Sequence, residues 1–268
     1  MAHSSFLNTL WLTIAWLTGT AVAADQTATL IATRDASIYH GLSGSDTLAD
    51  GSGPYLWTSV TAEGLVRRAL LKFDLSAIPS GAVVRQVTLT LWESRSRGDH
   101  NIALHRLLAN WGEGPANAGG SGAGAPAASG DSTWSHRIYP GTPWNTPGGE
   151  FDPVASAVQF VGSADASYSW SGALPAGGGA SPRIVIDVQS WVNAPAGNHG
   201  WIMIGNETTP QNAKRFESRN SGFDIRKPQL TVVYGDPVIV AEGDVPLPAW
   251  ALVMLASMLI ASGWRRFR

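Results

Sequence analysis

The sequence of 268 residues contains no cysteine. This absence excludes disulfide bonds, thiolate nucleophiles and cysteine-ligated zinc sites. A folded chain without any of these must be stabilised by a buried apolar core, and a chain of this length is long enough to form one.

Charged residues are also few. Asp, Glu, Lys and Arg make up 14% of the sequence, and the formal net charge is −2. No run of basic residues is long enough to follow a phosphate backbone, so nucleic acid is not an expected partner. Apolar residues reach 44%, which favours a folded chain over a disordered one.

The motifs of several enzyme classes are missing as well. There is no Gly-x-Ser-x-Gly elbow, no His-Glu-x-x-His pair and no glycine-rich loop with the Lys and Ser/Thr of a phosphate site. We therefore expect a protein that is not an enzyme. A glycosidase-type pair of carboxylates is the remaining alternative, because its members can be distant in sequence. The candidates for such a pair are Glu93, Glu113, Glu150 and Glu207.

The residues that are present predict an all-β fold. The clearest signal lies between residues 67 and 92, where apolar and polar side chains alternate on both sides of a turn at 79–82. Side chains that alternate in this way place one apolar row on one face of a strand. The two rows are Ala69, Leu71, Phe73 and Leu75, and then Val87, Leu89 and Leu91.

Similar but shorter patterns predict further strands. They cover residues 27–33, 36–39, 55–60, 102–108, 133–139, 154–162, 183–187, 201–204, 214–218 and 229–234. We expect no long helix before the C-terminal tail, and only a helical turn at 188–192. Two stretches rich in Gly, Ala and Pro, 112–130 and 173–182, are expected to be flexible surface loops. About ten short strands joined by turns indicate a β-sandwich or barrel.

The two ends of the chain are expected to lie outside this fold. Residues 1–23 are interpreted as a signal peptide, because an apolar run, Leu7–Leu17, precedes the small residues Ala21-Val22-Ala23. The alternative is a buried N-terminal helix. The domain would then span residues 24–236, followed by a linker at 237–244 and a C-terminal segment at 245–268.

The C-terminal segment combines a proline motif, an apolar helix and a basic tip. The apolar run, Trp250–Trp264, is shorter than the roughly 20 residues that span a bilayer. The motif Val245-Pro246-Leu247-Pro248-Ala249 resembles the VPLPA variant of the PEP-CTERM sorting signals. This resemblance implies a Gram-negative-type bacterium, export across the inner membrane, and an exosortase-type enzyme that processes the tail at the cell surface. An ordinary tail anchor is the alternative.

Four segments of the predicted domain resemble motifs of the DNRLRE domain family, and they occur in the family's order. They are Arg67–Ser76; Leu104-His105-Arg106 with Trp111-Gly112-Glu113-Gly114; Val188-Gln189-Ser190-Trp191 with Asn198-His199-Gly200-Trp201; and Arg215–Arg219. The resemblance implies a jelly-roll-like antiparallel β-sandwich related to carbohydrate-binding modules. Some members of the family bind acidic polysaccharides. The Glu that usually follows the last motif is Asn220 here.

Aromatic and basic side chains are the candidates for contact with a polysaccharide. Exposed aromatic rings stack on sugars, and guanidinium groups pair with uronate carboxylates. The predicted ligand-binding residues are Trp111, Trp134, Trp144, Arg95, Arg97, His100, Arg215 and Arg219. The alternatives are core packing for the aromatic residues, and solvated surface or internal salt bridges for the basic ones.

No cofactor is expected apart from a structural calcium ion, for which Asp35, Asp46 and Asp50 offer oxygen ligands without the spacing of an EF-hand. The sequence thus predicts an exported, non-catalytic protein of the cell envelope or extracellular matrix that binds polysaccharide. Two alternatives remain, a purely structural surface protein without a sugar site and a polysaccharide-degrading enzyme.

Overall fold

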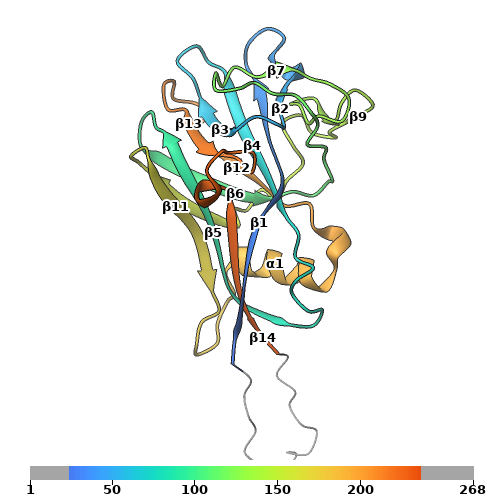
Figure 1. The fold of residues 1–268 in the computed structure, drawn as a ribbon, viewed down its shortest axis with the longest axis vertical. Coiled ribbons are helices and arrows are strands. Elements are labelled where there is room, and N and C mark those ends of the chain that lie inside the picture. The colour runs from blue at the N-terminus through green and yellow to red at the C-terminus, as the bar shows by residue number, and fades with distance from the viewer. Residues whose placement is uncertain (1–23, 237–268) are drawn as a thin grey trace, which may run out of the picture. The chain divides into compact units, whose positions relative to one another are not determined.

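A computed structural model of the chain describes residues 24–236. The predicted signal peptide, linker and sorting segment lie outside the described residues. Within residues 24–236, no helix is long and apolar enough to cross a membrane. The regular structure of these residues is mainly β-strands, all of which pair antiparallel, and this confirms the predicted all-β class (Figure 1).

The described residues form fourteen strands, one α-helix and three short 3-10 helices. The strands are β1 (Gln26–His40), β2 (Leu48–Asp50), β3 (Tyr55–Val60), β4 (Val66–Phe73), β5 (Val83–Arg95), β6 (His100–Arg106), β7 (Ala125–Pro126), β8 (His136–Ile138), β9 (Thr142–Pro143), β10 (Ala157–Val161), β11 (Ala166–Ala173), β12 (Trp201–Ile204), β13 (Lys214–Glu217) and β14 (Gln229–Gly235). The helices are α1 (Arg183–Asn193), η1 (Ser45–Thr47), η2 (Pro195–Gly197) and η3 (Asp224–Arg226).

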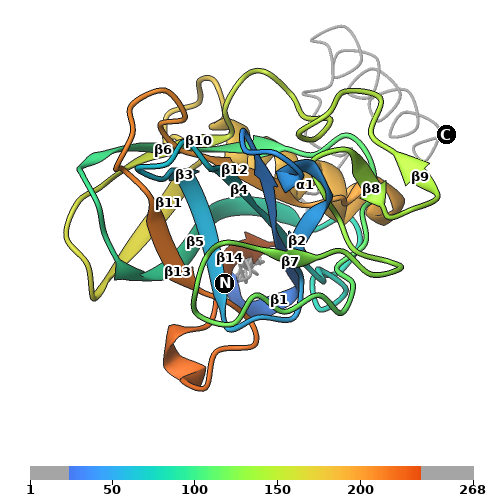
Figure 2. The same ribbon diagram turned by 90° about the horizontal axis from the view of Figure 1, so that it is seen from above.

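Six of the strands close into an antiparallel barrel. The order around the barrel is β1, β4, β3, β13, β5 and β14, and β14 returns to β1. The long strand β1 makes this closure possible, because its first part pairs with β14 and its second part with β4. Strands β12, β6 and β10 extend the sheet beyond β4, and β11 adds to β5 (Figures 1 and 2). Closure leaves the six central strands without a free edge.

The strongest strand signal of the sequence corresponds to β4 and β5, but these two strands do not pair with each other. β4 pairs with β1, β3 and β12, whereas β5 pairs with β11, β13 and β14. The connection at 74–82 therefore carries the chain from one side of the barrel to the other. The two predicted apolar rows meet in the interior.

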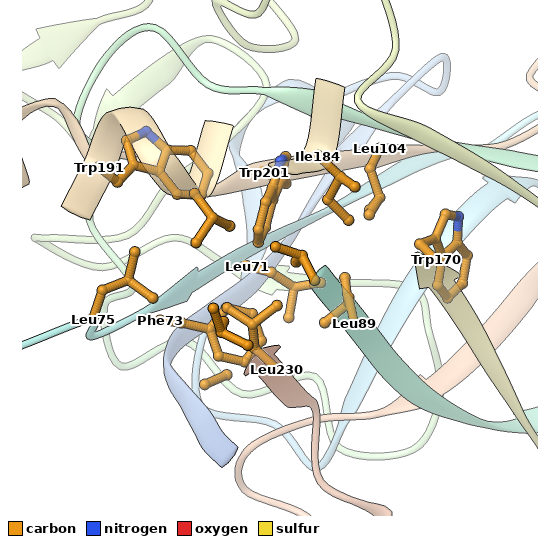
Figure 3. Close-up of a cluster of buried hydrophobic side chains, with 14 of the residues drawn as sticks. Leu71, Phe73, Leu75, Leu89, Leu104, Trp170, Ile184, Trp191, Trp201 and Leu230 are labelled. Carbon is orange, nitrogen blue, oxygen red and sulfur yellow. The ribbon is translucent and has the colours of Figure 1, made fainter. Parts of the chain in front are cut away.

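The interior is a single large cluster of apolar side chains. Figure 3 shows that it gathers residues from β4, β5, β11, β12, β14 and α1. The rings of Trp191 and Trp201 lie 4.6 Å apart, centroid to centroid, and the indole N–H of Trp170 donates to the carbonyl of Ile102 at 2.8 Å. Each large side chain that is fully buried contributes about 1.5–3 kcal/mol. This core stabilises a chain that has no disulfide bond.

The prediction of a strand at 183–187 is wrong, because these residues begin the helix α1. The buried residues of α1 follow helical spacing over its whole length, as Ile184, Val185, Val188, Trp191 and Val192. A window of five residues is too short to separate this pattern from strand alternation. The helix closes one side of the main core (Figure 1).

The strand β11 is absent from the sequence-based prediction. Its side chains are mostly small or polar, and Trp170 is its one fully buried residue. It forms a strand because it pairs with β5 along its whole length. Tertiary pairing here overrides weak intrinsic preference.

We expect Leu71→Ala to lower the free energy of unfolding by about 2–5 kcal/mol, because it leaves a cavity in the main core. Leu71 is fully buried, whereas Leu108 is 52% exposed. Leu108→Ala is therefore the matched control and should change stability little. Urea denaturation of both variants tests this expectation, and equal losses would contradict the assignment of the core.

Candidate functional site

The three predicted tryptophans lie together in a second buried cluster, on the opposite face of β4 from the main core. Trp111, Trp134 and Trp144 pack there with Leu70 and Ile202, and none of the three indoles is more than 8% exposed. They offer no open ring face to a sugar. Their predicted role as exposed stacking platforms is not met, and the core alternative describes them.

Arg68 joins this second cluster from β4. Its guanidinium lies 4.4 Å from the centre of the Trp134 ring and forms a two-pronged ion pair with Glu207, with N–O distances of 2.7 and 2.8 Å. A third bond, 2.8 Å long, runs from Arg68 to the carbonyl of Gly148. All of these partners are internal. Through Trp134 and Gly148, Arg68 ties β4 to the segment between β6 and β10, which we call the covering segment.

Arg219 is an internal cation of the same kind. Its guanidinium pairs with the carboxylate of Glu113, with one N–O distance of 2.7 Å, and its backbone N–H donates to Asp35 at 2.6 Å. The backbone N–H of Asp35 in turn donates to Glu113 at 2.9 Å. Arg219 therefore ties the end of β13 to β1 and to the segment after β6.

Buried carboxylates hold the Gly/Ala-rich segment 112–130 in place. Asp50 accepts the backbone N–H of Ala118, and Asp131 accepts those of Ala116 and Ala128, at 2.6–3.1 Å. The short strand β7 within this segment pairs with β2. The flexible surface loop predicted at 112–130 is therefore held in place through contacts of its backbone.

Five buried carboxyl groups have raised pKa values: Asp35, Asp50, Glu93, Asp131 and Asp187. Loss of solvation is the main cause in each, and it raises the pKa of Asp35 to about 7 and that of Asp50 to about 6. Burial also raises the pKa of Glu93 to about 7, although the nearby Lys214 and Arg215 oppose the shift. Within the described residues, neither carboxylate oxygen of Glu93 has a hydrogen-bond partner.

These raised pKa values make stability fall as the pH rises. The folded state binds protons that the unfolded state has already released, so this contribution is complete below about pH 4 and is lost as the pH passes 6 to 7. We expect Glu93→Gln to be more stable than the wild type near pH 8, by on the order of 2 kcal/mol, and equal to it near pH 4. Chemical denaturation at both pH values tests this. A constant difference between the two would refute the assignment.

A cleft of about 410 Å³ opens where the end of β3, the start of β4 and the end of β5 meet the segment at 119–124. We call it the arginine cleft, because three of its side chains are guanidinium groups and only one is acidic. It is lined by Trp57, Thr61, Ala62, Glu63, Arg67, Arg95, Arg97, Ser121, Gln211 and Ala213.

The inner wall of the arginine cleft is a stack of cations and aromatic rings. The guanidinium of Arg67 lies 4.7 Å from the centre of the Trp57 ring, and that of Arg215 lies 3.9 Å from the Tyr55 ring and 5.9 Å from Trp57. Burial, with a smaller effect of Arg95, lowers the pKa of Arg67 to about 10, so it stays charged at neutral pH. Arg215 also donates to the hydroxyl of Ser94 at 3.0 Å.

Arg95 and Arg97 lie at the rim of the cleft and are exposed. Among residues 24–236, neither side chain forms a salt bridge or a hydrogen bond. Their guanidinium forks are therefore available to a ligand. His100 differs, because it is buried and its Nε2 atom lies 2.8 Å from the hydroxyl oxygen of Ser59. Burial lowers the pKa of His100, which favours a neutral ring.

The structure thus separates the eight predicted residues. Arg95 and Arg97 line one cleft, Arg215 lies behind its wall, and the remaining five have internal partners or packing. Sequence reasoning missed Trp57 and Arg67, since both occupy strands whose alternation indicates core. The nearest signal in the sequence is the glycine-rich stretch at 119–124. In the structure, Gly122 of this stretch lies against both side chains.

The glycine-rich stretch lets the backbone lie directly on the inner wall. A Cβ atom added to Gly122 would lie 2.7 Å from Arg67 Nη1 and 2.8 Å from the Trp57 ring. Gly119 has a similar positive φ but nothing within 4 Å of an added Cβ. Substitution of either glycine meets the same backbone strain, and only Gly122 meets a steric clash.

We expect Gly122→Ala to destabilise the protein and to disturb the arginine cleft, whereas Gly119→Ala carries only the backbone strain of about 1–3 kcal/mol. The difference between the two melting temperatures measures the clash alone. Identical melting temperatures would show that the segment does not rest on Trp57 and Arg67.

No metal centre is formed by the described residues: within 24–236, no three His, Asp or Glu side chains are arranged to hold an ion. Of the three candidate calcium ligands, Asp46 pairs with His40 at 2.7 Å, and Asp35 and Asp50 accept backbone N–H groups. The four glutamates considered as a catalytic pair are also engaged or buried. Glu113 and Glu207 pair with arginines, Glu150 binds Asn145, and Glu93 is fully buried.

No family model matches the chain, and no curated protein matches its sequence. The segments that resemble family motifs nevertheless contact one another in the structure. Asn198 donates to the carbonyl of Phe73 at 2.9 Å, and the indole of Trp111 donates to that of His199 at 2.9 Å. Together with the ion pair of Glu113 and Arg219, these contacts link parts of the chain that are distant in the sequence, so the motif residues stabilise the fold.

Proposed function

We propose that this chain is an exported, non-catalytic protein that binds acidic polysaccharide in the arginine cleft. The observation that carries the proposal is the presence of two unpaired arginines, Arg95 and Arg97, beside the buried pair of Arg67 and Trp57. Three guanidinium groups converge there with one carboxylate, that of Glu63, to oppose them.

The chemistry of the cleft suits a uronate sugar. Guanidinium forks bind carboxylates through two parallel hydrogen bonds. Thr61, Ser121 and Gln211 add hydroxyl and amide groups that match sugar hydroxyls. Without its three terminal arginines the chain has a formal charge of −5, so it does not attract anionic polymers as a whole. Binding would therefore depend on the local gathering of arginines.

The remaining parts of the proposal concern fold family and location. A jelly-roll-like sandwich of the DNRLRE type is consistent with an antiparallel fold in which the motif segments meet. The signal peptide and the motif Val245–Ala249 support export across the inner membrane. An exosortase-type enzyme would process the tail, and the domain would reach the cell surface or matrix of a Gram-negative-type bacterium.

A purely structural surface protein is the second candidate function. It is favoured by the burial of Trp111, Trp134 and Trp144, which removes the aromatic platforms typical of sugar-binding surfaces. In that case the unpaired arginines would be solvated surface groups and no polysaccharide would be retained.

We expect Arg95→Ala with Arg97→Ala to weaken binding to polygalacturonate at least ~10-fold, because each charged hydrogen bond contributes about 1.5–3 kcal/mol. The control is Arg85→Ala with Arg183→Ala, which removes two arginines that pair with Asp25 and Asp152 and line neither cleft. Arg85 lies on β5 as Arg95 does, about 33 Å away along the strand. Affinity electrophoresis of the full chain measures the loss.

Three outcomes would contradict the proposal. Retention of neutral dextran as strong as that of polygalacturonate would show that carboxylates are not recognised. No retention of any acidic or neutral polysaccharide would favour the structural candidate. Release of reducing ends from the polymer would favour an enzyme.

A further inference from the structure

A second cleft, of about 570 Å³, opens near the other end of β4. Its lining includes Arg34 from β1, Lys72 at the end of β4, and Trp191 near the end of α1. Asp74 and Asn198 also contribute to its wall. Nothing in the proposed function uses this cleft.

Arg34 and Lys72 face each other across the ladder between β1 and β4. An irregularity in β1 between Ala32 and Arg34 shifts the register and sets Arg34 opposite Lys72. Like charges in directly opposed positions destabilise a sheet. Burial lowers the pKa of Lys72, and Arg34 lowers it further. The fold therefore holds two cations side by side, although their mutual repulsion lowers its stability.

No acidic side chain forms an ion pair with either cation within the described part of the chain, although the nearby carboxylate of Asp74 opposes the fall in the pKa of Lys72. Neither Arg34 nor Lys72 forms a salt bridge there. The carboxylate of Asp74, also in the cleft, accepts the backbone N–H and the hydroxyl of Ser76 at 3.0 and 2.9 Å. One guanidinium nitrogen of Arg34 donates to the carbonyl of Trp111 at 3.1 Å, which fixes its position.

The rest of the lining favours a ligand that also carries hydroxyl groups. Trp191 Nε1 and Asn198 Oδ1 are buried polar atoms without a hydrogen-bond partner among residues 24–236. An indole N–H needs an acceptor and an amide oxygen needs a donor, and a hydroxyl group is both. A sugar acid meets these needs together with those of the two cations.

We propose that the second cleft is a further carboxylate-binding site, in which Arg34 and Lys72 take the acid group of a sugar unit. The inference rests on the proposed function for the class of ligand, but it concerns different residues. The chain would then bind acidic polysaccharide at two points.

The positions of the two clefts on β4 would allow each cleft to bind a separate polymer chain. Arg67 lines the first cleft and Lys72 the second, and they are five residues apart on β4, or about 17 Å. An odd spacing puts their side chains on opposite faces of the strand. A short oligosaccharide in one cleft would not reach the other, so occupation of both would cross-link a polymer.

Calorimetry of the full chain with trigalacturonate tests this proposal. We expect two ligands bound to each wild-type chain and one bound to Lys72→Ala. Lys72→Arg should retain both sites, because it keeps the charge. Lys227→Ala is the control, since Lys227 pairs only with the neighbouring Asp224. Turbidity with polygalacturonate should appear with the wild type and disappear with Lys72→Ala or with Arg95→Ala/Arg97→Ala.

The outcomes separate the two sites. A single site that Lys72→Ala leaves intact and Arg95→Ala/Arg97→Ala removes would overturn the second cleft alone. A single site that only Lys72→Ala removes would overturn the arginine cleft and keep the second. No binding in any sample, with wild-type circular dichroism throughout, would overturn both.

Discussion

The fold depends on the burial of β4 on both of its faces. On the inner face, Leu71 and Phe73 belong to the main core, and on the outer face Leu70 lies among the buried tryptophans. A strand of a simple two-layer sheet protein needs cover on one side only. Here the outer cover comes from the segment between β6 and β10, which has little regular secondary structure of its own. Both clefts arise where this doubly covered strand begins and ends.

The part of the covering segment at 112–130 has few large side chains, and buried polar groups attach it to the barrel instead. Asp50 and Asp131 hold its backbone, while Glu113 within it binds Arg219 at the end of β13. Burial of such groups carries a desolvation cost, which the raised pKa values of Asp35 and Asp50 make visible. In a chain without cysteine, these contacts link segments that are distant in the sequence, as disulfide bonds do in many small exported domains.

The sequence predicts the parts of the fold that have a clear period. Strands β3 and β12 lie where alternation places them, and β4 and β5 contain the two apolar rows. The prediction fails where the structure of a segment is determined by contacts with residues that are distant in the sequence. β11 forms by pairing with β5, and the segment 112–130 is held by carboxylates from β2 and from residue 131. The rim of the arginine cleft was predictable because Arg95 and Arg97 lie in a polar stretch of the sequence, although Arg95 is the last residue of β5. The inner wall of this cleft was not predictable, because the alternation of side chains along a strand does not distinguish a tryptophan that lines a cleft from one in the core.

The residues that hold the covering segment on the barrel differ from those at the rim of the arginine cleft. Residues that resemble the family motifs, such as Trp111, Glu113 and Arg219, bind one another and fix the covering segment on the barrel. Arg95 and Arg97 belong to none of those motifs; Arg95 ends β5 and Arg97 lies in the connection that follows it, and both side chains are exposed, so they can vary without disturbing the core. A protein could therefore keep every motif and lose the cleft, or keep the cleft and change its charge. The motif residues account for how this chain folds, whereas the proposed binding depends on the residues at the ends of β3, β4 and β5.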